Sequence, residues 1–127
     1  MPSILRVLIV DDQPRARQSM KALLGVWYPA AEVREAADGS EAVQSAAEFG
    51  PDIICMDARM PKMGGLEATR RIKAIAPGSR IIVLSIYPDL EAEALQAGAD
   101  AFVGKSEPPE KLRETLKDLL GGFHQTP

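Results

Sequence analysis

Short apolar runs that alternate with longer amphipathic segments constrain the fold of this chain more than any other feature. We predict strands at five such runs, which are residues 4–10, 32–36, 52–56, 80–84 and 101–103. Because the segments between them are long enough for helices, the strands cannot pair as hairpins, and right-handed crossovers must join them into a parallel sheet. We therefore predict a doubly wound α/β fold, in which five helices cover both faces of a five-stranded sheet.

The helical segments carry apolar residues at spacings of three and four. We predict that the first helix begins near Pro14 and that Asp38 opens the second, with Glu41 three residues later in a capping-box pattern. The stripe of the third helix consists of Leu66, Thr69, Ile72 and Ile75. The fourth helix, about residues 89–97, is short and weakly packed, and the fifth covers about residues 109–120. The second strand is more polar than the others, which favours an edge of the sheet.

Length and composition limit the classes of function. The 127 residues suit one domain, which we place at residues 1–121, with residues 122–127 as a tail or the beginning of a linker. No segment has the pattern of a membrane span or an export signal, so we expect a cytoplasmic location. The net charge of −3 argues against direct nucleic-acid binding by this chain. Cys55 is the only cysteine, which excludes an internal disulfide.

Five polar residues follow the predicted strands, where the ligands of doubly wound sheets gather. They are Asp11 and Asp12 after the first strand, Asp57 after the third, Ser85 after the fourth and Lys105 shortly after the fifth. Each has an ordinary alternative: the aspartates and the serine could cap helices or lie in loops, and the lysine could be solvated. Their shared position at one edge of the sheet favours a common site.

This set of side chains suits metal-assisted phosphoryl transfer. Carboxylates ~5 Å apart repel by roughly 3 kcal/mol per pair at an effective dielectric constant of about 20, so a cation should bind between them. Oxygen ligands without histidine or cysteine favour a hard ion such as Mg²⁺, or Mn²⁺ in its place. An aspartate can itself be the nucleophile and form an aspartyl phosphate. Lys105 and Ser85 would then hold the phosphoryl oxygens.

The motifs resemble those of the response regulator receiver family. The matching residues are Asp11-Asp12, Asp57 with Met60-Pro61 and Gly64-Gly65, Ser85, and Gly98-Ala99-Asp100 leading to Lys105. The resemblance implies the flavodoxin-like strand order 2-1-3-4-5 and phosphotransfer from a sensor histidine kinase or a phosphotransfer protein. It implies that Asp57 is the phosphoacceptor. Asp12 would then bind the metal ion directly, Asp11 would act through water, and the backbone carbonyl of Arg59 would be a further ligand.

By the same resemblance, Ser85 and Phe102 occupy two switch positions. The alternative for Phe102 is a core aromatic residue of the last strand. Phosphorylation would draw Ser85 inward, and the signal would leave through the fourth helix, the fifth strand and the fifth helix. The recipient of the signal would be an output domain, for example one that controls transcription, or a target protein. A homodimer on activation is left open.

Several positions depart from the family's usual pattern. Ile86 stands where a small residue is usual, which predicts restricted access to the phosphoryl group. Ser106 stands where proline is frequent; we expect a trans peptide bond before it, or a strained cis bond, because cis without proline costs about 3 kcal/mol. Arg59 and Tyr87 flank the site and could either tune turnover or be exposed bystanders.

Three other classes of function fit less well. An aspartyl-phosphate-forming, Mg²⁺-dependent hydrolase normally carries an acid-base aspartate two residues after the nucleophile, where this chain has Arg59. A flavin or nucleotide carrier needs a glycine-rich phosphate loop, and Asp11-Asp12 would repel a phosphate there. A degenerate receiver that only binds partners would not need the intact acidic and basic set. We therefore expect a switch that catalyses only its own phosphotransfer and dephosphorylation.

Overall fold

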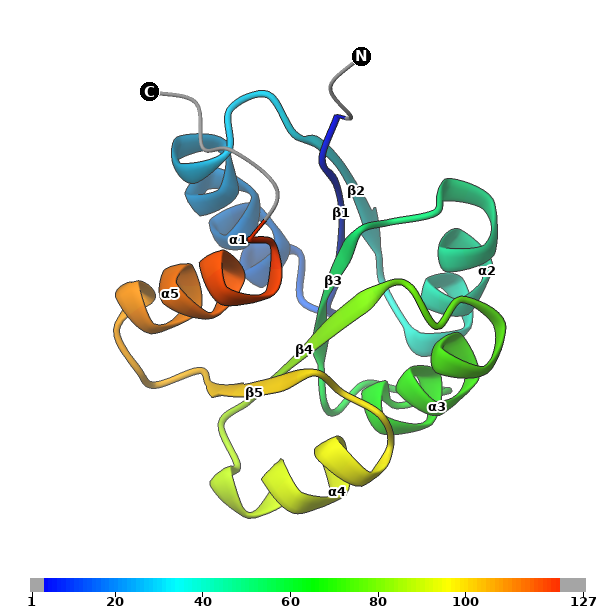
Figure 1. Ribbon diagram of the computed structural model, residues 1–127. Helices are drawn as coiled ribbons and strands as arrows, with labels where there is room; N and C mark the ends of the chain where they lie inside the picture. The colour runs from blue at the N-terminus through cyan, green and yellow to red at the C-terminus, as the bar shows by residue number, and fades with distance from the viewer. Residues whose placement is uncertain (1–3, 122–127) are drawn as a thin grey trace.

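A computed structural model of the chain describes residues 4–121 and contains one parallel sheet between two layers of helices (Figure 1). The strands are β1 (Arg6–Val10), β2 (Glu32–Ala36), β3 (Ile53–Asp57), β4 (Arg80–Ser85) and β5 (Ala101–Gly104). The helices are α1 (Pro14–Trp27), α2 (Gly39–Phe49), α3 (Gly65–Ile75), α4 (Glu91–Gln96) and α5 (Pro109–Leu119). The strand order is β2-β1-β3-β4-β5, which confirms the predicted doubly wound, flavodoxin-like fold.

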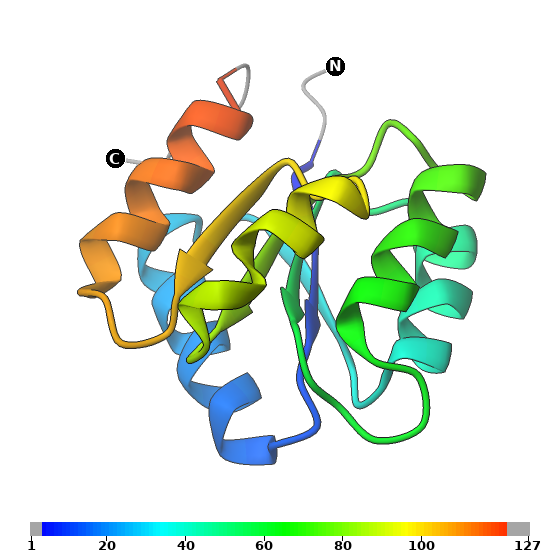
Figure 2. The same cartoon turned by 90° about the horizontal axis from the view of Figure 1, so that it is seen from below.

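The two faces of the sheet bury two separate apolar clusters. Leu8 and Ile54 belong to the cluster under α2, α3 and α4, whereas Val7 and Ile53 belong to the cluster under α1 and α5. Figure 2 shows α1 and α5 on one side of the sheet and α2 and α3 on the other. Because consecutive side chains of a strand point to opposite faces, strands covered on both sides need continuous apolar runs. The central strands have such runs, and the more polar β2 lies at the edge, as predicted.

Asp38 caps α2, as the sequence predicts. Its carboxylate accepts a hydrogen bond from the backbone N–H of Glu41 at 2.9 Å. The Glu41 carboxylate accepts in return from the N–H of Ala37 at 3.1 Å, one residue earlier than in a standard capping box. At α1 the residue before the helix, Gln13, makes no side-chain cap. Asp11 accepts from the N–H of Gln13 at 2.9 Å, so its carboxylate bonds to the residue ahead of the helix and not to the helix itself.

Several boundaries differ from the predicted ones. β1 begins at Arg6 because Ile4 lies exposed, ahead of the first pairing with β2. The fourth helical segment is divided, since a 3-10 turn, η1 (Pro88–Leu90), precedes the six-residue α4. β3 and β4 each extend one residue further than predicted, and they end at Asp57 and Ser85. These two polar side chains are therefore held by regular strand backbone and not by loops.

The buried face of α3 differs from the predicted stripe. Thr69 and Ile72 are fully buried as expected, but Ile75 is 55% exposed, so the prediction for Ile75 is wrong. The small residue Ala68 lies in the core instead, next to Thr69, whose hydroxyl donates to the carbonyl of Gly65 at 2.7 Å. The predicted stripe omitted Ala68 because apolar spacing favours large side chains. Close packing of α3 against α2 instead favours a small one at this position.

The helices are short, with α1 the longest at 14 residues. Within residues 4–121, none combines the length and the apolar content needed to cross a bilayer. The predicted tail, residues 122–127, lies outside the described residues, and the end of the domain at residue 121 stays a prediction.

Candidate functional site

Three aspartates lie together at the carboxyl edge of the sheet. β1 and β3 are neighbours in which Val10 pairs with Met56, so the residues that follow, Asp11 and Asp57, lie side by side. With Asp12 they bring carboxylate oxygens within 4.8 Å of one another. Asp11 and Asp57 are buried, and Asp12 is half-buried. The parallel topology thus assembles an acidic cluster from distant segments of the sequence.

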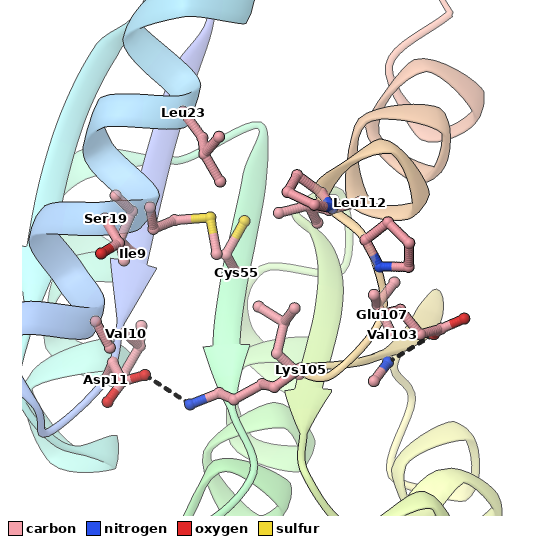
Figure 3. A pocket seen from close by; sticks show the side chains of 16 residues that line it. Ile9, Val10, Asp11, Ser19, Leu23, Cys55, Val103, Lys105, Glu107 and Leu112 are labelled. Carbon is pink, nitrogen blue, oxygen red and sulfur yellow. Dashed lines mark hydrogen bonds and ion pairs between the residues drawn. The ribbon is translucent and has the colours of Figure 1, made fainter.

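Lys105 reaches this cluster from the other half of the sheet. Its backbone N–H donates to the carbonyl of Ser85 at 2.8 Å, which fixes the lysine beside the end of β4. Its Nζ lies 2.8 Å from Oδ1 of Asp57 and 2.9 Å from Oδ2 of Asp11. Figure 3 shows the side chain extended toward Asp11. Lysine is long enough to pass the end of the intervening strand, so one ammonium bridges two carboxylates.

Burial and neighbouring charges shift the pKa values of both Asp57 and Lys105. Burial raises the pKa of Asp57; Lys105 opposes this effect, and the other two carboxylates of the cluster add to it. Burial lowers the pKa of Lys105, but its hydrogen bonds to Asp57 and Asp11 outweigh that effect and leave the pKa raised. The contact therefore favours the charged lysine, while Asp57 ionises less readily than an ordinary aspartate. A single lysine does not offset burial together with two further acids.

The cluster is short of positive charge. Three ionised carboxylates and one ammonium leave two negative charges, which one divalent cation would balance. Within residues 4–121 the Asp12 carboxylate has no hydrogen-bond or ion-pair partner, and Oδ2 of Asp57 accepts no hydrogen bond. Both oxygens of Asp11, in contrast, already accept bonds, from the N–H of Gln13 and from Lys105. The open oxygens are hard ligands of the kind that Mg²⁺ prefers.

Ser85 brings a buried hydroxyl to the same pocket. The pocket has a volume of about 230 Å³, and its walls are Asp11, Asp12, Gln13, Asp57, Arg59, Ser85, Ile86, Tyr87 and Lys105. The Ser85 Oγ accepts a hydrogen bond from the backbone N–H of Tyr87 at 2.9 Å. The hydroxyl therefore holds the beginning of the loop between β4 and α4, and its own proton stays available for donation to a ligand.

Arg59 and Tyr87 contact each other across the rim of the pocket. The Arg59 guanidinium lies 4.3 Å from the centre of the Tyr87 ring, a cation–π geometry. Ile86 lies beside them and is 62% exposed. The sequence places these three residues near the site, but it gives no sign that an arginine after β3 and a tyrosine after β4 touch. Their effect on phosphoryl turnover, and that of Ile86 on access, stay predictions.

Phe102 does not join the acidic pocket. It is half-buried on β5, packs against the cluster under α2, α3 and α4, and lines a separate recess of about 410 Å³ next to Ser85 and Pro88. The peptide bond between Lys105 and Ser106 is trans, as expected without proline.

Fold and pocket together define a class of protein: a flavodoxin-like domain that presents carboxylates for a divalent cation, and a lysine and a hydroxyl for an anion, at one edge of its sheet. The family model of the response regulator receiver domain matches residues 7–117. The chain therefore belongs to the response regulator receiver family.

The chain spans about half the length of several curated relatives that it matches, and nearly the whole length of another. The chain is 40% identical over 117 residues to the chemotaxis protein CheY of Thermotoga maritima, and the aligned region covers 90% of this chain and 96% of CheY. It is 36% identical over 118 residues to the transcriptional activator protein ExaE of Pseudomonas putida, and this aligned region covers 91% of this chain but 55% of ExaE. Among solved structures, the response regulator TrrA of T. maritima, in complex with Mg²⁺ and BeF, matches with a TM-score of 0.84 and 31% identity, over 92% of this chain and 100% of TrrA.

Proposed function

We propose that Asp57 accepts a phosphoryl group and that this modification switches the chain between two states of a two-component system. The observation that carries the proposal is the position of Asp57, whose Oδ1 contacts Lys105 at 2.8 Å while Oδ2 has no donor among the described residues. That free oxygen can attack the phosphorus of a phosphohistidine, which breaks the phosphorus–nitrogen bond and leaves the electron pair on the imidazole.

Asp12 offers open carboxylate oxygens for Mg²⁺ or Mn²⁺, and Oδ1 of Asp57, the oxygen that does not attack the phosphorus, would join them once Lys105 has moved away. We infer that Asp11 acts through water because both of its oxygens are occupied. Arg59 lines the pocket, and its backbone carbonyl is the further ligand that we propose. A bound ion would supply the positive charge that lets an anionic phosphoryl group approach an acidic cluster. The complex of the relative TrrA with Mg²⁺ and BeF supports this assignment.

Lys105 and Ser85 would then change partners. The ammonium of Lys105 moves from the Asp57 carboxylate to an oxygen of the phosphoryl group, and keeps an ionic contact at nearly the same place. Ser85 turns its hydroxyl toward another oxygen and gives up the hydrogen bond from the N–H of Tyr87. Loss of that bond frees the loop that leads into η1 and α4. A local change of charge thereby reaches a surface element.

The recess beside Phe102 supplies room for the next step. Ser85 and Phe102 both line it, and it lies between the loop after β4 and the beginning of α5. When Ser85 turns toward the phosphoryl group, Phe102 moves into the space that opens beside it. The switched surface therefore consists of α4, β5 and α5, and the short α4 is the element that moves most easily.

The proposed binding partners are those typical of response regulator receiver domains. The phosphoryl donor is a sensor histidine kinase or a phosphotransfer protein. The recipient of the signal is an output domain or a target protein, and the similarity to ExaE favours transcriptional control. A homodimer of the phosphorylated form and a cytoplasmic location belong to the same proposal.

Phosphodonor labelling tests the proposal. The wild-type chain is incubated with acetyl phosphate, with and without Mg²⁺, and analysed by intact mass and peptide mapping. We expect one phosphoryl group on Asp57 in the presence of Mg²⁺ and none in the Asp57→Asn variant. The Asp89→Asn variant, which makes the same change at an exposed residue, should label like the wild type.

Two results would contradict this function. A label that survives in Asp57→Asn would place the acceptor elsewhere. Continuous release of phosphate from acetyl phosphate, with no labelled chain at any time, would instead indicate the hydrolase.

A further inference from the structure

Arg17 joins three elements beside the acidic pocket, although it does not line the pocket itself. It lies in α1, and its Nη1 donates to the backbone carbonyl of Asp11 at 2.7 Å. Its Nε donates to Oε1 of Glu35 on β2 at 3.1 Å. The side chain is only 19% exposed, so water competes little for these two bonds. One guanidinium therefore connects α1, the end of β1 and the edge strand β2.

The bond to Asp11 acts on the peptide unit that leads into Asp12. A peptide unit is planar, so a hydrogen bond to its carbonyl fixes the direction of the whole unit. On the other side, the N–H of Asp11 donates to the carbonyl of Ala36 at 3.1 Å. The Asp12 carboxylate has no hydrogen-bond or ion-pair partner within residues 4–121. Its direction is therefore set by the backbone that carries it, and Arg17 holds this backbone.

Glu35 keeps the arginine away from the acidic cluster. A guanidinium close to three carboxylates normally pairs with one of them. Here Glu35 binds the Nε of Arg17, and the Nζ of Lys21 lies 3.4 Å from the other oxygen of the same carboxylate. Among the ion pairs of residues 4–121, Arg17 has none with the three aspartates of the cluster. The charge of Arg17 is thus balanced outside the pocket, and the oxygens of Asp12 stay open for a cation.

We propose that Arg17 is a positioning residue for the metal ion. Through the peptide between Asp11 and Asp12 it directs the Asp12 carboxylate into the pocket, and Glu35 anchors the guanidinium in this place. Arg17 contacts neither the ion nor the phosphoryl group. The inference rests on the proposed function, in which Asp12 binds Mg²⁺, and it adds to that function a residue from outside the pocket.

The sign of the effect on metal affinity separates positioning from charge. Removal of a cation near an acidic cluster makes the local potential more negative, so charge alone predicts tighter Mg²⁺ binding when Arg17 is replaced by alanine. A positioning role predicts weaker binding, since groups that orient a metal ligand commonly change the metal affinity by about 10–100-fold. A purely structural role, in which Arg17 only attaches α1 to the sheet, lowers the Tm and leaves the affinity of the folded protein unchanged.

Calorimetric titration with Mg²⁺, at neutral pH and well below each Tm, measures the dissociation constant without a phosphodonor. We expect Arg17→Ala to raise the dissociation constant by about tenfold. Arg15→Ala, which removes an exposed arginine from the same helix, should leave it unchanged or slightly lower. Arg17→Lys keeps the charge, but one ammonium does not reproduce the two-pronged contact, so its dissociation constant should lie in between. In the metal-free protein, the amide signal of Asp12 should shift further in Arg17→Ala than in Arg15→Ala.

An unchanged or lower dissociation constant in folded Arg17→Ala would overturn the inference, and so would an equal rise in Arg15→Ala. If Arg17→Ala does not fold, Arg17→Lys decides by the same criterion. Labelling with acetyl phosphate keeps this result separate from the proposed function. A wild type that is labelled on Asp57, together with an unchanged Mg²⁺ affinity of Arg17→Ala, refutes the positioning role alone. Weaker Mg²⁺ binding by Arg17→Ala, with no labelling of the wild type, supports the positioning role and refutes phosphotransfer, whereas no Mg²⁺ binding by the wild type overturns both.

Discussion

Asp57 lies in surroundings that make its charge unfavourable without a metal ion. It is buried at the end of β3, it has two acidic neighbours, and the one ammonium that contacts it is shared with Asp11. The raised pKa of Asp57 is the result. For the same reasons, binding of a cation or covalent modification of Asp57 would change the net charge of the acidic cluster directly.

The first prediction concerns this charge. Because the folded pKa of Asp57 lies above its ordinary value of 3.8, its favourable contribution to stability is present below that pH and is lost as the pH rises through the folded pKa. At pH ~7 without metal, Asp57→Asn should therefore melt a few degrees above the wild type, with the gap closing in acid. Thermal unfolding across pH, in the presence of a chelator, measures both curves. Asp89→Asn should stay close to the wild type, and a lower Tm for Asp57→Asn at neutral pH would show that the Lys105 contact outweighs the repulsion.

The sequence predicted the residues of the pocket better than their contacts. Asp11, Asp57 and Lys105 could be grouped because the ends of parallel strands must meet, whatever the details of the loops. The contact between Arg59 and Tyr87 could not be predicted, since both residues lie in irregular segments whose backbone angles depend on tertiary packing. The hydrogen bond from the N–H of Tyr87 to Ser85 was missed for the same reason.

Among the elements, the connection from β3 to α3 depends most on tight packing. A Cβ built on Gly65 would overlap the backbone carbonyl of Asp57, so α3 begins directly against the residue that we propose as phosphoacceptor. The N–H of Gly65 donates to the carbonyl of Ala58 at 3.0 Å, which closes the loop. Only glycine permits this approach without a shift of the backbone.

Gly65→Ala should therefore destabilise the fold by roughly 2–4 kcal/mol, since the clash is with backbone and not with a flexible side chain. Gly25→Ala is the matched control: Gly25 lies within α1 with open space around its Cα, and alanine should stabilise the helix by about 0.5–1 kcal/mol. Urea unfolding at equilibrium measures both changes. Equal effects of the two substitutions would mean that the loop after β3 rearranges easily.

The apolar runs predicted each of the five strands within residues 4–121. The observed bounds of strands and helices differ from the predicted ones where hydrophobic spacing carries little information. The segment after β4 contains few large apolar side chains, so its division into η1 and α4 is decided by local turn geometry at Pro88. The strand ends at Asp57 and Ser85 are decided by pairing with neighbouring strands, which a single run of residues does not reveal.

The whole molecule assembles its acidic pocket only when the sheet is complete. Asp11 follows β1, Asp57 ends β3 and Lys105 follows β5. The ion pair between Lys105 and Asp11 joins residues 94 positions apart. In the unfolded chain these groups are separate and hydrated. A metal ion that needs the clustered carboxylates therefore binds the folded state alone, and its binding energy adds to the free energy of unfolding.

Mg²⁺ should consequently raise the Tm of the wild type in proportion to the logarithm of its concentration, with a gain of about 2.7 kcal/mol at one hundred times the dissociation constant. The gain should shrink as the pH falls, because protons compete with the ion for Asp57, whose pKa is raised. Asp12→Asn removes the carboxylate that has no partner within residues 4–121 and should lose most of the gain, whereas Asp118→Asn, an equal change at an exposed position of α5, should keep it. Calorimetric scans at several Mg²⁺ concentrations distinguish the variants. Because nonspecific screening would act on all three proteins alike, equal gains in all of them would mean that the ion does not bind within the acidic cluster.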